Sequence, residues 1–209
     1  MAKVARAFWM LLLPGLLAAA GCGKPGGPAE TGGATAPSPS RWAVTTADVV
    51  YSVADNWDDV EKLYQFYGKG VEKCVEGCPS PVPKLYPEGL SAEARDPLIS
   101  AHPAYSAKGE VGETILRFPV ALPEEPTYLL FGAFLSRAPG PSDGAEFVVK
   151  VGDETVFSEV INSSSAQRRE VDLRAYAGKT VTIKLITGPG PRKNVSADWA
   201  LWLDPRIVR

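Results

Sequence analysis

The chain has 209 residues, of which 22 are Lys or Arg and 24 are Asp or Glu, so its formal charge at pH 7 is −2. This near balance, without any basic run, argues against a nucleic-acid-binding protein, which would carry a positive patch. The length suits one domain with a substantial hydrophobic core.

The first 21 residues have the pattern of a signal peptide. Lys3 and Arg6 precede an apolar run at positions 7–17, and small residues follow it. The run is shorter than the roughly 20 apolar residues that a membrane-spanning helix needs. Because Lys3 and Arg6 are the only charged residues in this segment, its removal would leave 20 basic and 24 acidic residues, a formal charge of about −4.

The sequence Ala19-Ala20-Gly21-Cys22 resembles the lipobox of bacterial lipoproteins. The resemblance implies cleavage before Cys22 and attachment of acyl chains such as palmitate to this residue. More than one acyl chain makes anchoring stable, so the protein would be held on a membrane surface of the cell envelope without spanning it. By the same resemblance, Gly23 favours the outer membrane of a Gram-negative organism. The alternative is an ordinary signal peptide followed by an unrelated cysteine.

After Cys22, the chain up to residue 40 is rich in Gly, Pro, Ala, Ser and Thr. Such a composition buries too little apolar surface to offset the loss of chain entropy on folding. We therefore expect residues 22–40 to form a disordered tether. We expect residues 41–209 to form a single domain, because no internal repeat or second linker interrupts them.

The folded part begins with an alternating pattern at positions 49–53 and then changes period. In the next segment apolar residues fall at helical spacings, Asn56 can cap the first amides, and Gly68 can end a helix. We therefore expect a short helix over residues 56–67, packed on one rim of the fold. The apolar positions are Trp57, Val60, Leu63, Tyr64 and Tyr67.

Two cysteines, Cys74 and Cys78, follow this segment. An exported protein meets an oxidising compartment, and the spacing differs from the C-x-x-C of thiol oxidoreductases. Gly77 and Pro79 allow the chain to fold back on itself. We expect a disulfide between Cys74 and Cys78 that pins this loop, with a redox or metal-binding pair as the alternative.

The rest of the chain consists of short strand patterns separated by turns. Gly152-Asp153 lies between two of them and suits a tight hairpin. Short strands with frequent turns predict an all-β antiparallel sandwich or barrel. The expected strands are 114–120, 127–135, 147–151, 155–161 and 169–173.

The last forty residues predict a hairpin-like closure of this sandwich. Val181, Ile183 and Leu185 alternate with polar residues, the pattern of a half-buried strand, and a Gly/Pro loop leads to a final strand. Trp199 and Trp202 are separated by an odd number of residues, so they point to opposite faces of that strand. One of the two should belong to the core.

Several segments follow one another in an order typical of one family of β-sandwiches. They are Pro97–Pro103, Lys108–Glu110, the strand around Phe118, Phe131–Leu135, Ser142–Phe147, Val171–Thr180 and Asp198–Pro205. Their order resembles that of the galactose-binding-like jelly rolls, and among them the NPCBM-type carbohydrate-binding modules, over about Leu98 to Ile207. The resemblance implies a jelly-roll β-sandwich that recognises its ligand through loops at one end.

Catalytic groups are few. His102 is the only histidine, so any triad or Cys-His pair must use it, and its place before Pro103 suits a structural residue in a loop. The acidic pairs Asp58-Asp59 and Glu124-Glu125 have the pattern of solvated turns. We therefore expect no enzyme activity and no cofactor. Related sandwiches often carry a calcium ion in a loop, so the resemblance leaves room for a structural calcium.

Two loops offer the polar groups that bind sugar hydroxyls. Arg137 and Asp143 lie in one loop, Arg192 and Asn194 lie in the loop before the last strand, and the four would line one site if these loops share a rim. Trp202 is the candidate aromatic contact. The alternative is that these polar residues are solvated turn residues and that both tryptophans pack inside the fold.

Taken together, these features predict a lipid-anchored protein of the bacterial envelope. Its sandwich domain would recognise a glycan or another envelope polymer without catalysis. The alternative is a structural or assembly lipoprotein that uses the same fold to bind an envelope protein.

Overall fold

A computed structural model describes residues 42–43, 46–73, 80–89, 96–136 and 142–209. Contacts divide the chain into the units Met1–Thr31 and Gly32–Arg209, and every described residue belongs to the second unit. The signal peptide, Cys22, the tether, the Cys74–Cys78 pair and Arg137 lie outside the described residues, so the roles assigned to them stay predictions. No helix of the described residues is both long enough and apolar enough to cross a bilayer.

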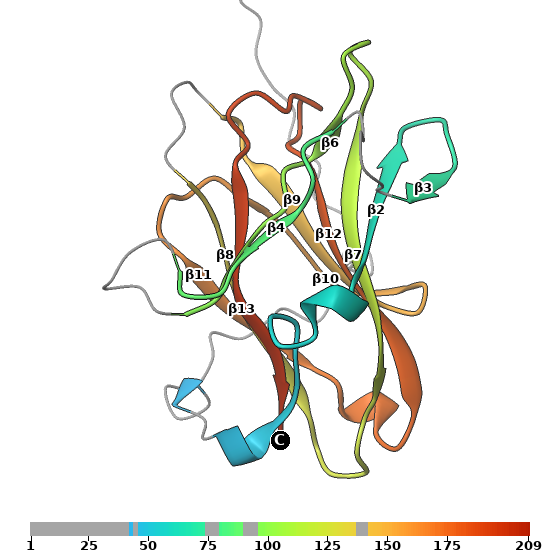
Figure 1. The fold of residues 1–209 in the computed structure, drawn as a ribbon, viewed down its shortest axis with the longest axis vertical. Coiled ribbons are helices and arrows are strands. Elements are labelled where there is room, and N and C mark those ends of the chain that lie inside the picture. Colours follow the sequence, from blue (N-terminus) through green and yellow to red (C-terminus); the bar gives the residue numbers. More distant parts are fainter. Residues whose placement is uncertain (1–41, 44–45, 74–79, 90–95, 137–141) are drawn as a thin grey trace, which may run out of the picture. The chain divides into compact units, whose positions relative to one another are not determined.

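The described chain forms two antiparallel sheets (Figure 1), which confirms the predicted all-β sandwich. The six-stranded sheet has the order β11 (Gln167–Asp172), β8 (Tyr128–Leu135), β13 (Ala200–Val208), β5 (Leu98–Ser100) and β4 (Lys84–Tyr86), and β1 (Val49–Ser52) also pairs with β13. The seven-stranded sheet has the order β10 (Glu154–Ile161), β9 (Ala145–Val151), β12 (Thr180–Pro189), β7 (Val111–Ala121), β2 (Glu61–Phe66) and β3 (Val71–Lys73), and β6 (Ala104–Tyr105) also pairs with β7. Within the described residues, 3-10 turns cover Thr46–Asp48, Trp57–Asp59 and Arg174–Tyr176.

Trp202 lies at the centre of the core between the sheets. Its side chain is fully buried, and its ring centroid lies 5.1 Å from that of Phe131 and 5.0 Å from that of Phe147. Phe131 belongs to the same sheet as Trp202, whereas Phe147 belongs to the facing sheet. These aromatic contacts therefore join the two layers.

Two local predictions from the sequence are confirmed. Ile183 and Leu185 of β12 are fully buried, as their alternation with polar residues required. Gly152 adopts a φ of +61° in the turn between β9 and β10, a conformation that glycine accepts without strain.

The expected hairpin closure is wrong, because the last two strands belong to different sheets. β12 pairs with β7 and β9, whereas β13 pairs with β8, β5 and β1. The connection, residues 190–199, is longer than the usual hairpin loop and passes from one layer to the other. Figure 1 shows the two red strands in separate layers.

The expected helix over residues 56–67 is also wrong. A 3-10 turn, Trp57–Asp59, is followed by strand β2, which pairs with β7 on one side and with β3 on the other. Tyr64 and Phe66 are buried on one face of β2, and Leu63 is buried on the other with Ile115 of β7. A strand that buries side chains on both faces loses its simple alternation, and its apolar spacing then imitates a helix.

Candidate functional site

Exposed aromatic side chains gather at one end of the sandwich. Tyr67, Tyr105 and Trp199 are 45%, 38% and 49% exposed, and they are the aromatic residues with large exposure in the described part of the chain. The amide of Tyr67 donates to the carbonyl oxygen of Val111 (3.1 Å), and Tyr105 pairs with the same residue at the start of β7. We call Tyr67, Tyr105 and Trp199 the aromatic rim. β6, the strand that carries Tyr105, is labelled near the upper end of Figure 1.

The buried ring of His102 packs against two of these exposed rings. Its side chain is buried, and its ring centroid lies 5.2 Å from that of Tyr105 and 5.5 Å from that of Trp199, edge-on to both. Nδ1 lies 2.7 Å from the carbonyl oxygen of Pro103, which can only accept a hydrogen bond. Burial lowers the pKa of His102, although hydrogen bonds with the backbone of Pro103 and Val195 oppose this shift. This geometry supports the predicted structural role of His102.

The two loops that the sequence singled out do meet at this end. The amide of Arg192 donates to Asp143 Oδ2 (3.0 Å), and the hydroxyl of Ser142 donates to Asp198 Oδ1. A Cβ on Gly190 would lie 2.1 Å from the carbonyl oxygen of Gly144, so this approach of the two loops requires glycine. The structure thus brings Asp143 and Arg192 together.

The tip of the second loop lies beside the aromatic rim. The ammonium of Lys193 lies 5.1 Å from the ring centroid of Tyr67, within the range of a cation–π contact. Asn194 Oδ1 accepts a hydrogen bond from the amide of Ser196 (2.9 Å), which holds the following turn. Asn194 therefore lies in the predicted loop and shapes it, and its side chain is exposed.

Trp202 was the wrong tryptophan for a ligand contact. It is fully buried between the sheets, so its ring is out of reach of any ligand. Trp199, in the loop just before β13, is the exposed one. The sequence placed the two on opposite faces but did not show which face was outer. Tyr67, Tyr105 and Lys193 were missed, because their proximity depends on the pairing of β2 and β6 with β7.

The resemblance allows a structural calcium ion. Two carboxylates at the base of the loops are therefore considered as its ligands. Asp143 Oδ1 and Asp198 Oδ2 are both buried and have no hydrogen-bond partner. Burial raises the pKa of Asp198, and the charge of Asp143 adds to the effect. Calcium takes six to eight oxygen ligands, and no group of three or more His, Cys, Asp or Glu suited to a metal occurs within the described ranges. Two carboxylate oxygens do not make such a shell.

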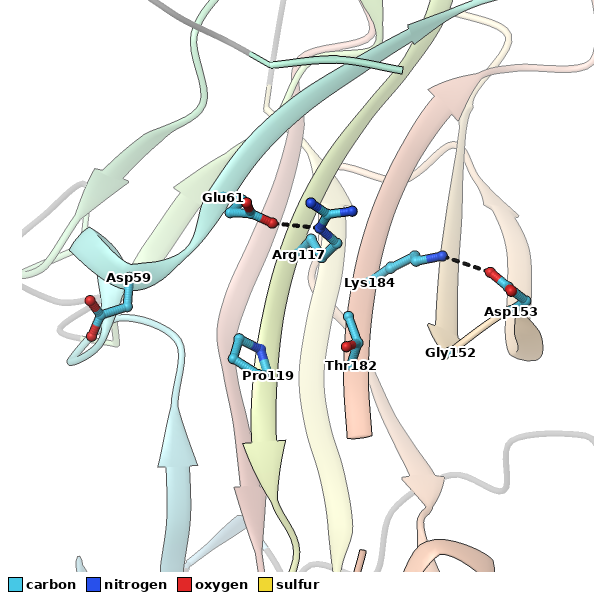
Figure 2. Close-up of a pocket in the computed structure, with 8 residues that line it drawn as sticks. All are labelled: Asp59, Glu61, Arg117, Pro119, Gly152, Asp153, Thr182 and Lys184. Carbon is cyan, nitrogen blue, oxygen red and sulfur yellow. Dashed lines mark hydrogen bonds and ion pairs between the residues drawn. The ribbon is translucent and has the colours of Figure 1, made fainter. Parts of the chain in front are cut away.

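A hollow of about 670 Å³ lies on the outer face of the seven-stranded sheet (Figure 2). Figure 2 shows Arg117 and Lys184 pointing out side by side, with Glu61 next to Arg117 and Asp153 next to Lys184. Arg117 forms an ion pair with Glu61, and Lys184 forms one with Asp153 (2.9 Å). Both cations are neutralised by a neighbouring carboxylate, and no aromatic side chain lines the hollow. We therefore place the candidate site at the aromatic rim.

Comparison with known proteins finds no matching family model. An uncharacterized protein of Archaeoglobus fulgidus is 42% identical over 79 residues, which are 33% of this chain and 20% of that protein. The chain thus spans about a fifth of the length of this curated relative.

Several solved structures are similar to the chain at low identity. TmCBM61 in complex with beta-1,4-galactotriose is 13% identical, with a TM-score of 0.42, and the match covers 71% of this chain and 88% of that one. CBM51 from Clostridium perfringens GH95 in complex with methyl-galactose is 13% identical, with a TM-score of 0.38 and coverage of 60% and 88%. The K1 cleaved adhesin domain of Lys-gingipain from Porphyromonas gingivalis W83 is 11% identical, with a TM-score of 0.44 and coverage of 71% and 97%. Carbohydrate-binding modules are therefore among the structures to which this chain is similar.

Proposed function

We propose that this chain binds glycans without cleaving them, through the aromatic rim. The observation that carries the proposal is the grouping of the exposed rings of Tyr67, Tyr105 and Trp199 at one end of the sandwich. Aromatic faces that are accessible to solvent can stack on the apolar faces of sugar rings. Polar groups from the loop of Arg192 to Asn194 lie next to them and can bind the sugar hydroxyls.

The rim is built on a rigid support. The buried ring of His102 holds Tyr105 and Trp199, and the loop before β13 is fixed to Asp143 and Ser142. A ligand therefore meets rings whose positions are already set, which reduces the entropy lost on binding. His102 lies beneath the rings and burial lowers its pKa, which suits support better than proton transfer.

We also propose that Cys22 carries the lipid anchor and that the rim points away from the place where the chain enters the domain. Val49 of β1 pairs with Val208 at the far end of β13, whereas Trp199 precedes the start of β13. Figure 1 shows Thr46–Asp48 and the C-terminus at the lower end, whereas β6, which carries Tyr105, is labelled near the upper end.

Screening the purified protein on a glycan array tests the proposed function. We expect binding to at least one glycan, and we expect Trp199→Ala to weaken it about tenfold or more through the loss of stacking area. Trp199→Phe should retain most of the affinity, because it keeps an aromatic face. Unchanged melting temperatures would show that both variants are folded. The absence of binding to any glycan, together with a co-purifying envelope protein, would instead favour an assembly role.

A further inference from the structure

The loop between β12 and β13 carries two consecutive cationic residues and brings the second of them, Lys193, to the rim. Arg192 and Lys193 are both exposed. Neither forms an ion pair with a carboxylate of the described residues. Other cations of the domain do form such pairs, namely Lys69, Arg117, Arg169, Arg174, Lys184 and Arg206.

The backbone fixes the position of these two cations. The amide of Lys193 donates to the carbonyl oxygen of Gly190 (2.8 Å) and closes a turn, and the amide of Arg192 donates to Asp143 Oδ2 (3.0 Å). Lys193 has a φ of +54°, a left-handed conformation that costs free energy in a residue other than glycine. Strain of this kind persists where the surroundings impose it, and it is common at binding sites.

The same turn brings Lys193 to the rings. Its ammonium lies 5.1 Å from the ring centroid of Tyr67. Burial raises the pKa of Tyr67, and the carboxylates of Glu113 and Glu146 add to the shift, so its hydroxyl stays protonated and remains a hydrogen-bond donor. A ligand at this end of the rim therefore meets an ammonium and a phenol that can both donate to an anionic oxygen.

We infer that the glycan bound at the aromatic rim carries a negative charge, on a uronic-acid carboxylate or a sulfate ester, and that Arg192 and Lys193 bind this group. The inference rests on the proposed function and names its ligand class. Hydrogen bonds from a guanidinium or an ammonium to an anion are roughly twice as strong as neutral ones.

The test compares charged and neutral forms of the same polymer. Affinities of the purified protein are measured for polygalacturonate and its methyl ester, and for dextran sulfate and dextran. We expect the charged member of one pair to bind about tenfold more tightly than its neutral partner, which corresponds to the lower end of the range for one charged hydrogen bond. Tighter binding of polygalacturonate than of its methyl ester would show that the recognised group is a carboxylate. Tighter binding of dextran sulfate than of dextran would show that it is a sulfate.

Variants then assign the charge recognition to residues. Arg192→Ala and Lys193→Ala should each reduce the affinity for the charged polymer about tenfold and reduce its salt dependence. Arg192→Lys should lose less, because it keeps the charge but not the planar donor fork. Lys179→Ala removes an equal charge just before β12, at the end of the sandwich opposite the rim, and should leave the affinity unchanged.

Three results would overturn the inference. The first is equal affinity for charged and neutral polymers, with binding that depends on Trp199 but not on Arg192 or Lys193. This result would refute the inference that the bound glycan is negatively charged, but it would not contradict the proposed function. No binding to these polymers or to any arrayed glycan would refute both. Binding of dextran sulfate and of polyglutamate that Trp199→Ala leaves unchanged would show general attraction of polyanions and not recognition of a sugar.

Discussion

The indole nitrogen of Trp202 donates a hydrogen bond to the hydroxyl of Thr187 (2.9 Å), and the two residues belong to different sheets. Both side chains are fully buried. Because both groups are buried, neither can form a hydrogen bond with water if its partner is lost. This hydrogen bond therefore links the two sheets, next to the loop that carries Trp199.

Replacing this hydroxyl should destabilise the fold. Thr187→Val keeps the shape of the side chain and leaves the indole N–H without an acceptor, so we expect the free energy of unfolding to fall by about 1–3 kcal/mol. Urea denaturation measures the change. Thr187→Ser restores the acceptor and should lose less. Equal stability of the valine variant and the natural chain would show that the hydrogen bond contributes nothing.

A buried carboxyl in β13 should make stability depend on pH. Asp204 is 8% exposed, and burial raises its pKa from 3.8 to about 6, against the attraction of Arg206 and with the repulsion of Asp96 and Asp55. A group whose folded pKa lies above its unfolded value stabilises the fold fully below pH 3.8 and loses this contribution as the pH rises to about 6. The free energy of unfolding should therefore fall across this window.

Asp204→Asn imitates the protonated carboxyl at every pH, and asparagine tolerates the φ of +44° found here. The variant should be more stable than the natural chain at pH 7, by up to about 3 kcal/mol on conversion of the pKa shift, and similar to it at pH 4. Urea denaturation between pH 4 and pH 7 measures both. Asp58→Asn, the same substitution at an exposed position, serves as the matched control. An unaltered profile in Asp204→Asn would contradict the assignment.

The alternation of apolar and polar residues in the sequence correctly predicted strands that bury only one face. Ile183 and Leu185 alternate with polar residues because the outer face of β12 carries Thr182 and Lys184 at these positions. The same logic failed for β2, which is covered on both faces. Alternation also says which side chains share a face, but not which sheet a strand joins, and the closing strands were paired wrongly for this reason.

The site could be predicted only in part for a similar reason. The sequence placed Asp143 and Arg192 in one site only on the condition that their loops share a rim, and the structure brings these two residues together. To decide whether Trp199 or Trp202 is exposed to a ligand, one must know which of the two side chains points into the core. The odd separation of the two residues in the sequence does not give this information. Tyr67 and Tyr105 meet around Val111 through strand pairings that no local pattern encodes.

The unpartnered carboxylate oxygens at the base of the loops should cost stability at neutral pH. Burial raises the pKa of Asp198, so its ionised form opposes folding above that pKa and the penalty disappears as the pH falls below it. Asp198→Asn removes the charge and can still accept from Ser142. Its amide can also donate, whereas the carboxylate oxygen Oδ2 has no hydrogen-bond partner. We expect a gain of about 1 kcal/mol at pH 7, the net value of one buried hydrogen bond, and a smaller gain in acid.

Thermal unfolding with calcium or with a chelator separates this explanation from a metal site. We expect neither addition to change the melting temperature of the natural chain. A rise with calcium that Asp198→Asn abolishes would show that a cation occupies the pair of carboxylates, and the expected gain from the asparagine would then be wrong.

The contact between Gly190 and Gly144 should couple loop packing to ligand binding. A Cβ at position 190 would lie 2.1 Å from the carbonyl oxygen of Gly144, closer than any real contact, so Gly190→Ala must push the two loops apart. We expect the free energy of unfolding to fall by about 1–3 kcal/mol. We also expect a lower affinity for the glycan, because Arg192 and Lys193 move with the turn. Gly70→Ala meets no atom within 4 Å and is the matched control. If Gly190→Ala lowered the melting temperature but left glycan affinity intact, the position of this turn would not matter for recognition.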